Sequence, residues 1–177
     1  MLRISLFFRT LLFVFLIYMV LQPIVAAADS EVVSEKSPLY QEVMPAASEG
    51  KNAVLKKQVE VLVSYVLPEA RKKVASDLKN RNSDLYGIFY KRKDSIYDRL
   101  RKAKRLKIVL VKRKELEGAG QGTEAYYYDE DKIKLQFPLS DKKAQSLLDE
   151  RKIVLMFFFK DKEEEGNERW FASYEFF

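Results

Sequence analysis

The stretch LKIVLVK, residues 106–112, decides the fold, because the spacing of apolar residues changes there. Ahead of it, apolar side chains recur at three- and four-residue steps, as on one face of a helix. From residue 106 onward, β-branched and aromatic runs typical of strands take over. We therefore expect an α+β domain in which two or three N-terminal helices pack on a four- to five-stranded antiparallel sheet.

Two helical stripes are expected before residue 106. Pro68 interrupts the first stripe, which predicts either a kink or a second helix that has Pro68 in its first turn. Ser83 is a suitable N-cap for the second stripe. The first stripe consists of Leu55, Val59, Leu62, Val66, Ala70, Val74 and Leu78, and the second of Leu85, Phe89, Ile96, Leu100 and Ala103.

The second half of the chain alternates strand patterns with turn residues. Ser140 is expected to cap a short helix that ends near Glu150. The other expected elements are a flexible loop at 118–122, a short strand at 125–128, a hairpin turn at 129–131, a half-buried strand at 133–137, a buried strand at 153–159, a turn at 163–167 and a returning strand at 170–177.

The first 28 residues have the order of a secretory signal peptide. Arg3 and Arg9 precede the apolar run 11–21, Pro23 follows it, and Ala26-Ala27-Ala28 offers a cleavage site. The alternative is an uncleaved anchor, since residues 11–28 approach the roughly 20 residues that span a bilayer. The proline and the small residues favour cleavage, so we expect a periplasmic or secreted protein.

A spacer is expected after the signal peptide. Residues 29–51 are rich in Ser, Pro and acidic residues and contain a single aromatic residue, Tyr40. Such a composition predicts a flexible linker. The folded part would then be a single α+β domain over residues 52–177, long enough to bury one core.

The absence of Cys and His excludes several chemistries. No disulfide can form, and neither a Ser-His-Asp nor a Cys-His nucleophile is available. The commonest zinc ligand is also missing. We therefore expect no enzyme activity, no metal and no cofactor. A hydrolase that depends on carboxylates or a Lys is the enzymatic alternative.

A basic tract between residues 91 and 114 holds twelve basic and only two acidic side chains, whereas the chain as a whole carries a net charge of +6. This excess favours binding to an anionic membrane lipid, an envelope polymer or an acidic protein, with nucleic acid less favoured. The alternative is a solvated face balanced by the acidic residues of 115–177. The tract consists of Lys91, Arg92, Lys93, Arg99, Arg101, Lys102, Lys104, Arg105, Lys107, Lys112, Arg113 and Lys114.

Three further features have a structural and a functional interpretation. Tyr86, Phe89, Tyr90 and Tyr97 could stack on nucleic-acid bases. At helical spacing, Phe89 is more typical of a core and the tyrosines of its boundary. The acidic runs 129–131 and 163–165 lack the spacing of a calcium loop and are more typical of turns. The glycines of 118–122 lack the Lys-Ser/Thr ending of a phosphate loop.

The function expected from the sequence is thus an exported, non-enzymatic binding domain with a basic surface. A secreted effector that acts on a host or competitor protein is a second possibility within the same class. A structural alternative is an envelope assembly subunit joined through its aromatic C-terminal strand. The sequence does not set the oligomeric state.

We expect the exported protein to begin at or near Asp29, because signal peptidase accepts small side chains such as those of Ala26–Ala28. Mass spectrometry of the exported product checks this. A membrane-bound product with its original N-terminus would instead identify residues 11–28 as an anchor.

Overall fold

The computed structural model describes residues 30–116, 120–162 and 168–173. The expected signal peptide, the cleavage site before Asp29 and the expected turn at 163–167 lie outside the described residues. So does the end of the returning strand, residues 174–177.

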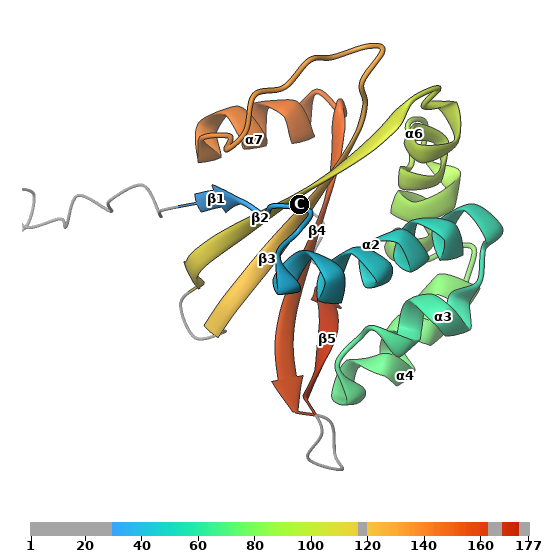
Figure 1. The fold of residues 1–177 in the computed structure, drawn as a ribbon. Helices are drawn as coiled ribbons and strands as arrows, with labels where there is room; N and C mark the ends of the chain where they lie inside the picture. Colours follow the sequence, from blue (N-terminus) through green and yellow to red (C-terminus); the bar gives the residue numbers. More distant parts are fainter. Residues whose placement is uncertain (1–29, 117–119, 163–167, 174–177) are drawn as a thin grey trace, which may run out of the picture.

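In this part of the chain the strands form one five-stranded antiparallel sheet in the order β1-β2-β3-β4-β5 (Figure 1). Sequential neighbours pair throughout, so every connection joins adjacent strands. The expected α+β class is confirmed. The strands are β1 (Ser30–Val32), β2 (Leu106–Leu116), β3 (Gly120–Asp129), β4 (Ile153–Lys162) and β5 (Glu168–Ser173).

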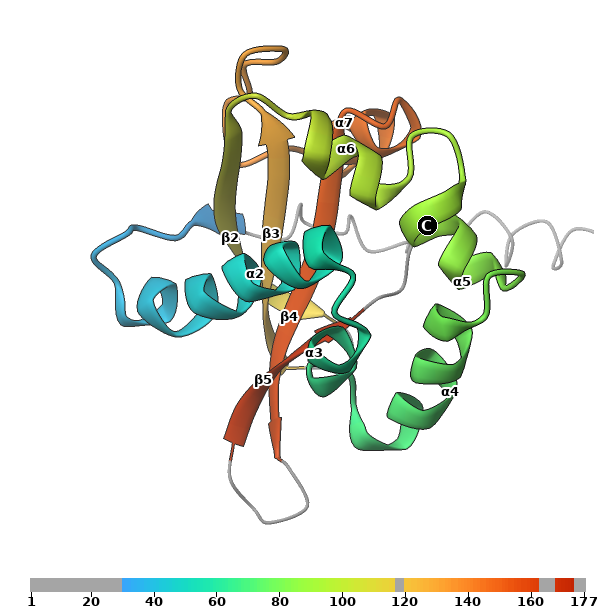
Figure 2. The same ribbon diagram turned by 90° about the vertical axis from the view of Figure 1, so that its right-hand side faces the viewer.

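Helices cover both faces of the sheet. In Figure 2, α2 crosses in front of the strands and α7 lies behind them. The helical elements are α2 (Pro38–Lys56), α3 (Val59–Ser64), α4 (Pro68–Lys79), α5 (Asp84–Tyr86), a π-helical turn (Gly87–Lys91), α6 (Ile96–Lys102) and α7 (Asp141–Asp149).

Each face of the sheet therefore has its own core. Leu62 and Phe89 pack with Tyr127 of β3 on the face covered by α2 to α6. Tyr126 of β3 packs with Leu147 of α7 on the other face. Alternate residues of a strand point to opposite faces, so β3 contributes to both cores and is buried from Gly122 to Asp129.

The expected helix boundaries at proline and serine are confirmed. Pro68 lies in the first turn of α4, where its missing N–H leaves no helical hydrogen bond unmade. The Ser83 hydroxyl accepts a hydrogen bond from the Tyr86 amide at 3.0 Å. The Ser140 hydroxyl accepts one from the Lys143 amide at 3.4 Å at the start of α7.

The prediction of a flexible linker over residues 29–51 is wrong for the described part, 30–51. Ser37 caps α2, and Val43 and Ala47 are fully buried against the sheet. The small residues that suggested a spacer instead let the helix approach closely. A side chain added at Gly50 would already contact the Met156 sulfur at 3.7 Å.

Two other expectations need correction. The second helical stripe is not continuous, because the π-helical turn ends at Lys91 and α6 begins only after its own N-cap, Ser95. The segment 133–137 forms no strand. Its Phe137 ring instead packs edge-on against Tyr126, 5.2 Å between ring centres, and covers the core under α7.

The glycine-rich segment is likewise more ordered than expected over the residues described. Gly120 and Gly122 belong to β3, and Gly122 pairs with Phe159 of β4. The expected turn after β3 is present, but it does not form a hairpin, because the segment that follows, 133–137, is irregular and not a strand.

We expect Val43→Asp to lower the free energy of unfolding by about 3 kcal/mol or more. Val43 is completely buried, so a charged side chain at this position would have neither water nor a partner. Asn52→Asp adds the same charge on the exposed side of the helix and should change the free energy of unfolding by less than about 0.5 kcal/mol. Urea unfolding measures both. Equal, small effects would mean that α2 does not belong to the folded core.

Candidate functional site

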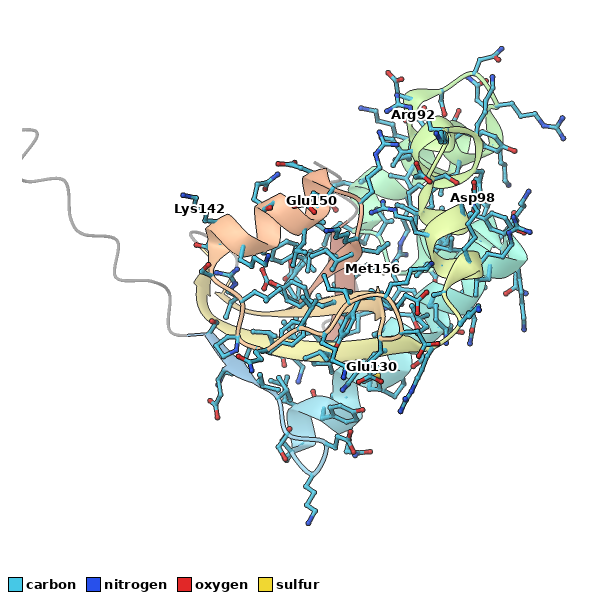
Figure 3. All side chains as sticks on the ribbon, turned by 90° about the horizontal axis from the view of Figure 1, so that it is seen from above. Arg92, Asp98, Glu130, Lys142, Glu150 and Met156 are labelled. Atoms are coloured by element: carbon cyan, nitrogen blue, oxygen red, sulfur yellow. The ribbon has the colours of Figure 1, made fainter. Side chains whose placement is uncertain are left out.

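A cavity of about 240 Å³ lies where β3 ends and β4 begins. It opens between α6, the turn after β3 and the residues just ahead of β4. In the view from above, Asp98 of α6, Glu130 of the turn and Glu150 after α7 surround this end of the sheet (Figure 3). The lining residues are Arg99, Leu100, Lys102, Leu106, Tyr127, Tyr128, Asp129, Lys132, Ile133, Arg151, Lys152, Ile153 and Val154.

This site, which we call the basic cavity, has five basic lining residues and one acidic one. Four of the five bases have an acidic partner beside them. These pairs are Lys102 with Asp98 at 3.7 Å, Lys132 with Asp129 at 3.0 Å, Arg151 with Asp94 at 3.8 Å, and Lys152 with Glu150.

Arg99 is the exception, because it has no ion pair with any described residue. Its Nη1 donates a hydrogen bond to the Ile153 carbonyl at 2.6 Å, and its buried Nε–H has no hydrogen-bond partner. Burial, followed by the nearby positive charge of Arg151, lowers the pKa of the guanidinium. An arginine remains charged nevertheless. The negative charge of Asp94, which also pairs with Arg151, acts in the opposite direction on this pKa. The basic cavity therefore holds a largely buried positive charge that has no direct ion pair among the described residues.

Asp129, the acidic residue of the lining, is held by its surroundings. Its carboxylate accepts hydrogen bonds from the Lys104 and Asp131 amides, both at 3.3 Å. The hydrogen bond from Lys132 lowers its pKa. This carboxylate closes the turn after β3, which agrees with the turn interpretation of the run 129–131.

The structure does not gather the predicted basic tract into one surface. Arg99 and Lys102 line the basic cavity. Lys91, Lys93 and Lys104 are exposed. The other described members near this end of the sheet have acidic neighbours, namely Arg92 with Asp84 at 2.7 Å, Arg101 with Asp98 at 3.5 Å, and Arg105 and Lys107 with Glu130 at 3.2 and 2.9 Å.

The C-terminal members of the tract lie further along β2. Lys112 lines a second hollow beside Trp170, and the side chain of Lys114 lies outside the described residues. Lys112 lies five positions after Lys107, about 17 Å along a strand. The tract is therefore divided along β2.

Arg113 has a structural role that the sequence did not indicate. Its side chain is only 14% exposed, and it pairs with the buried Glu124 at 3.0 Å and with Asp141 of α7 at 2.7 Å. Tyr126 donates a hydrogen bond to the same Glu124 carboxylate at 2.5 Å. Burial, and then Glu124, raise the pKa of this tyrosine. The network links α7 to β2 and β3.

Sequence reasoning missed three of the five bases of the basic cavity, Lys132, Arg151 and Lys152. They stand outside the basic tract, in segments whose local charge is balanced by acids. No signal along the chain joins them to Arg99, which lies 54 residues from Ile153 and meets it only across the folded sheet.

The tyrosines proposed as base-stacking residues contact one another instead. The Tyr90 ring lies 5.3 Å from Tyr86 and 6.3 Å from Tyr97, measured between centres. Two cations lie over the Tyr97 ring: the Lys57 Nζ is 5.1 Å and the Arg101 Cζ is 5.7 Å from the ring centre. These neighbours occupy ring faces that a base would need, so the core-boundary interpretation fits better.

Comparison with known proteins identifies no relative: no family model, no curated protein and no solved structure matches this chain. Among the described residues, no helix is long and apolar enough to cross a membrane. The same residues contain no cluster of three or more potential metal-ligating carboxylates. The basic cavity is therefore the feature from which a function can be inferred.

We expect Tyr90→Phe to leave the stability unchanged or slightly higher, because the buried Tyr90 hydroxyl has no hydrogen-bond partner and burial raises its pKa to about 12. Tyr127→Phe removes a buried hydrogen bond to the Ala47 carbonyl, 2.9 Å long, and should cost about 1 kcal/mol or more. Thermal unfolding compares the two. A destabilised Tyr90→Phe variant would show that this hydroxyl has a bound partner in solution.

Proposed function

We propose that this chain is an exported, non-enzymatic binding domain that engages an anionic partner at the basic cavity. One observation carries the proposal: five bases line one cavity, and the largely buried Arg99, unlike the other four, has no ion pair with a described residue. A positive charge held partly out of water attracts an anion more strongly than an exposed one does. The partner is an anionic lipid, an envelope polymer or an acidic protein.

The bases around the basic cavity outnumber the acids beside them. Arg101 and Lys102 share Asp98, and Arg105 and Lys107 share Glu130, so each group keeps a net positive charge. Such charges steer an anionic partner toward a site over a Debye length of about 8 Å at physiological ionic strength.

The alternatives have less support. A carboxylate-dependent hydrolase needs two carboxylates that face the same space, whereas Asp129 is the single acid of the basic cavity and is held by Lys132. Assembly through β5 needs an open strand edge. The Ala172 amide of that edge donates to the Tyr65 carbonyl at 2.8 Å, and Arg169 donates to the Ser64 carbonyl at 3.0 Å.

We expect the protein to bind anionic phosphatidylglycerol vesicles with an affinity that falls steeply as salt is added. A triple variant, Lys102→Gln, Lys132→Gln and Lys152→Gln, should weaken this binding about a hundredfold, since each lysine near an anionic membrane contributes about 1 kcal/mol. All three side chains are exposed, so the fold should persist. Vesicle co-sedimentation across a salt series measures the affinity.

The matched control removes three exposed lysines that do not line the basic cavity, Lys56→Gln, Lys72→Gln and Lys73→Gln. It changes net charge equally and should retain most of the binding. Polyphosphate and an acidic protein, which represent the other two classes of partner, are assayed in the same way. Equal losses in both triple variants would show that only total charge matters, and the absence of binding to every anionic partner would refute the proposal.

A further inference from the structure

The interior of the basic cavity is apolar although its rim is charged. Leu100 and Tyr127 come from the core under α2 to α6, and Ile133 and Ile153 come from the core under α7. The cavity thus reaches between the two cores at the end of the sheet. A ligand that fills it has an apolar part beside its anionic group. At about 240 Å³ the volume suits a compact ligand, below the roughly 300–1,000 Å³ of typical drug-sized sites.

Arg99 has hydrogen-bonding capacity left for such a ligand. One of its nitrogens is engaged by the Ile153 carbonyl, while the Nε–H has no partner. The Nε–H is too deeply buried for a ligand to reach, whereas the other terminal nitrogen, Nη2, makes no hydrogen bond with a described residue and can donate to an anion in the cavity. Arginine presents its N–H groups as a planar fork that matches the oxygens of an oxyanion.

The number of bases favours a phosphate over a carboxylate. A phosphomonoester carries a charge of about −1.5 to −2 and three acceptor oxygens at pH 7, whereas a carboxylate carries one charge on two oxygens. Arg99 lies near Arg151, which pairs with Asp94. Lys102, Lys132 and Lys152 also line the cavity, each beside one acid, and each ammonium group has further N–H donors. A group with several oxygens can satisfy more than one of these cations at once.

We propose that the basic cavity binds the phosphomonoester group of a ligand with a small apolar part, and that Arg99 is the residue that recognises the phosphate. This inference deepens the proposed function and rests on it. The apolar walls hold the body of the ligand, and the lysines of the rim add charge without the directional fork of the arginine.

Phenyl phosphate is the probe, and isothermal titration calorimetry at low salt is the measurement. We expect saturable one-to-one binding, stronger than that of inorganic phosphate, which lacks the ring, and of benzoate, which lacks the phosphate. Arg99→Lys keeps the positive charge but loses the fork and should weaken phenyl phosphate binding about tenfold or more. Arg101→Lys, on the exposed side of the same helix, is the matched control and should bind as the unaltered protein does.

A second variant, Ile133→Phe, tests the cavity without changing charge. It fills the apolar space and should also weaken phenyl phosphate binding, while thermal unfolding confirms that each variant is folded. Vesicles that contain phosphatidic acid separate the sources of the phosphate. If the protein binds these vesicles and the binding depends on Arg99, the ligand is a lipid phosphomonoester. If it binds phenyl phosphate but not the vesicles, the ligand is a soluble phosphomonoester.

Failure of this inference can be told apart from failure of the proposed function. Binding to phosphatidylglycerol vesicles together with no saturable binding of phenyl phosphate would overturn the phosphate site and leave the proposed function standing. Equal affinity for phenyl phosphate and benzoate, or an unchanged affinity in a folded Arg99→Lys variant, would also overturn it. Loss of binding to every anionic probe would remove both.

Discussion

Burial of β3 on both faces is the constraint on which the rest of the structure depends. Tyr127 points toward α2 and donates a hydrogen bond to the Ala47 carbonyl, while Tyr126 and Tyr128 point toward the core under α7. Aromatic side chains bury more apolar surface than any others, so this short run supplies a large part of both cores. Because β3 lies in the middle of the sheet, neither helical layer has a surface to pack on until β2 and β4 have paired with it.

The end of β3 then determines the position of the basic cavity. Asp129 fixes the turn that brings Lys132 and Ile133 to the end of the sheet. Antiparallel pairing of Tyr128 with Ile153 brings the start of β4, and with it Arg151, to the same place. Buried Leu100 holds α6 against the core, and Arg99 beside it meets the Ile153 carbonyl. Three separate segments therefore supply the charges.

The density of basic residues along the sequence predicted a larger basic surface than the structure has, and it did not indicate the basic cavity. Most described members of the tract near α6 and the start of β2 have an acidic neighbour, and exposed pairs of this kind contribute little to stability or to binding. Arg113 is engaged by Glu124 and Asp141 inside the fold. Arg99 differs from the other described members of the tract because its charge is largely buried and has no ion pair with a described residue.

The sequence by itself determined the α+β class, the division at Pro68, the serine caps and the strands at 106–112 and 153–159, because periodicity and capping act between residues a few positions apart. Only the tertiary structure decided that residues 38–51 form part of a buried helix. The serines, prolines and acidic residues of this segment indicate a spacer along the sequence, and burial of Val43 and Ala47 depends on packing against the distant sheet. The same holds for the candidate site. Arg99 and Lys102 were visible as bases. Their meeting with Lys132, Arg151 and Lys152 depends on the pairing of β3 with β4 and on a contact between Arg99 and Ile153, 54 residues apart, which no local pattern records.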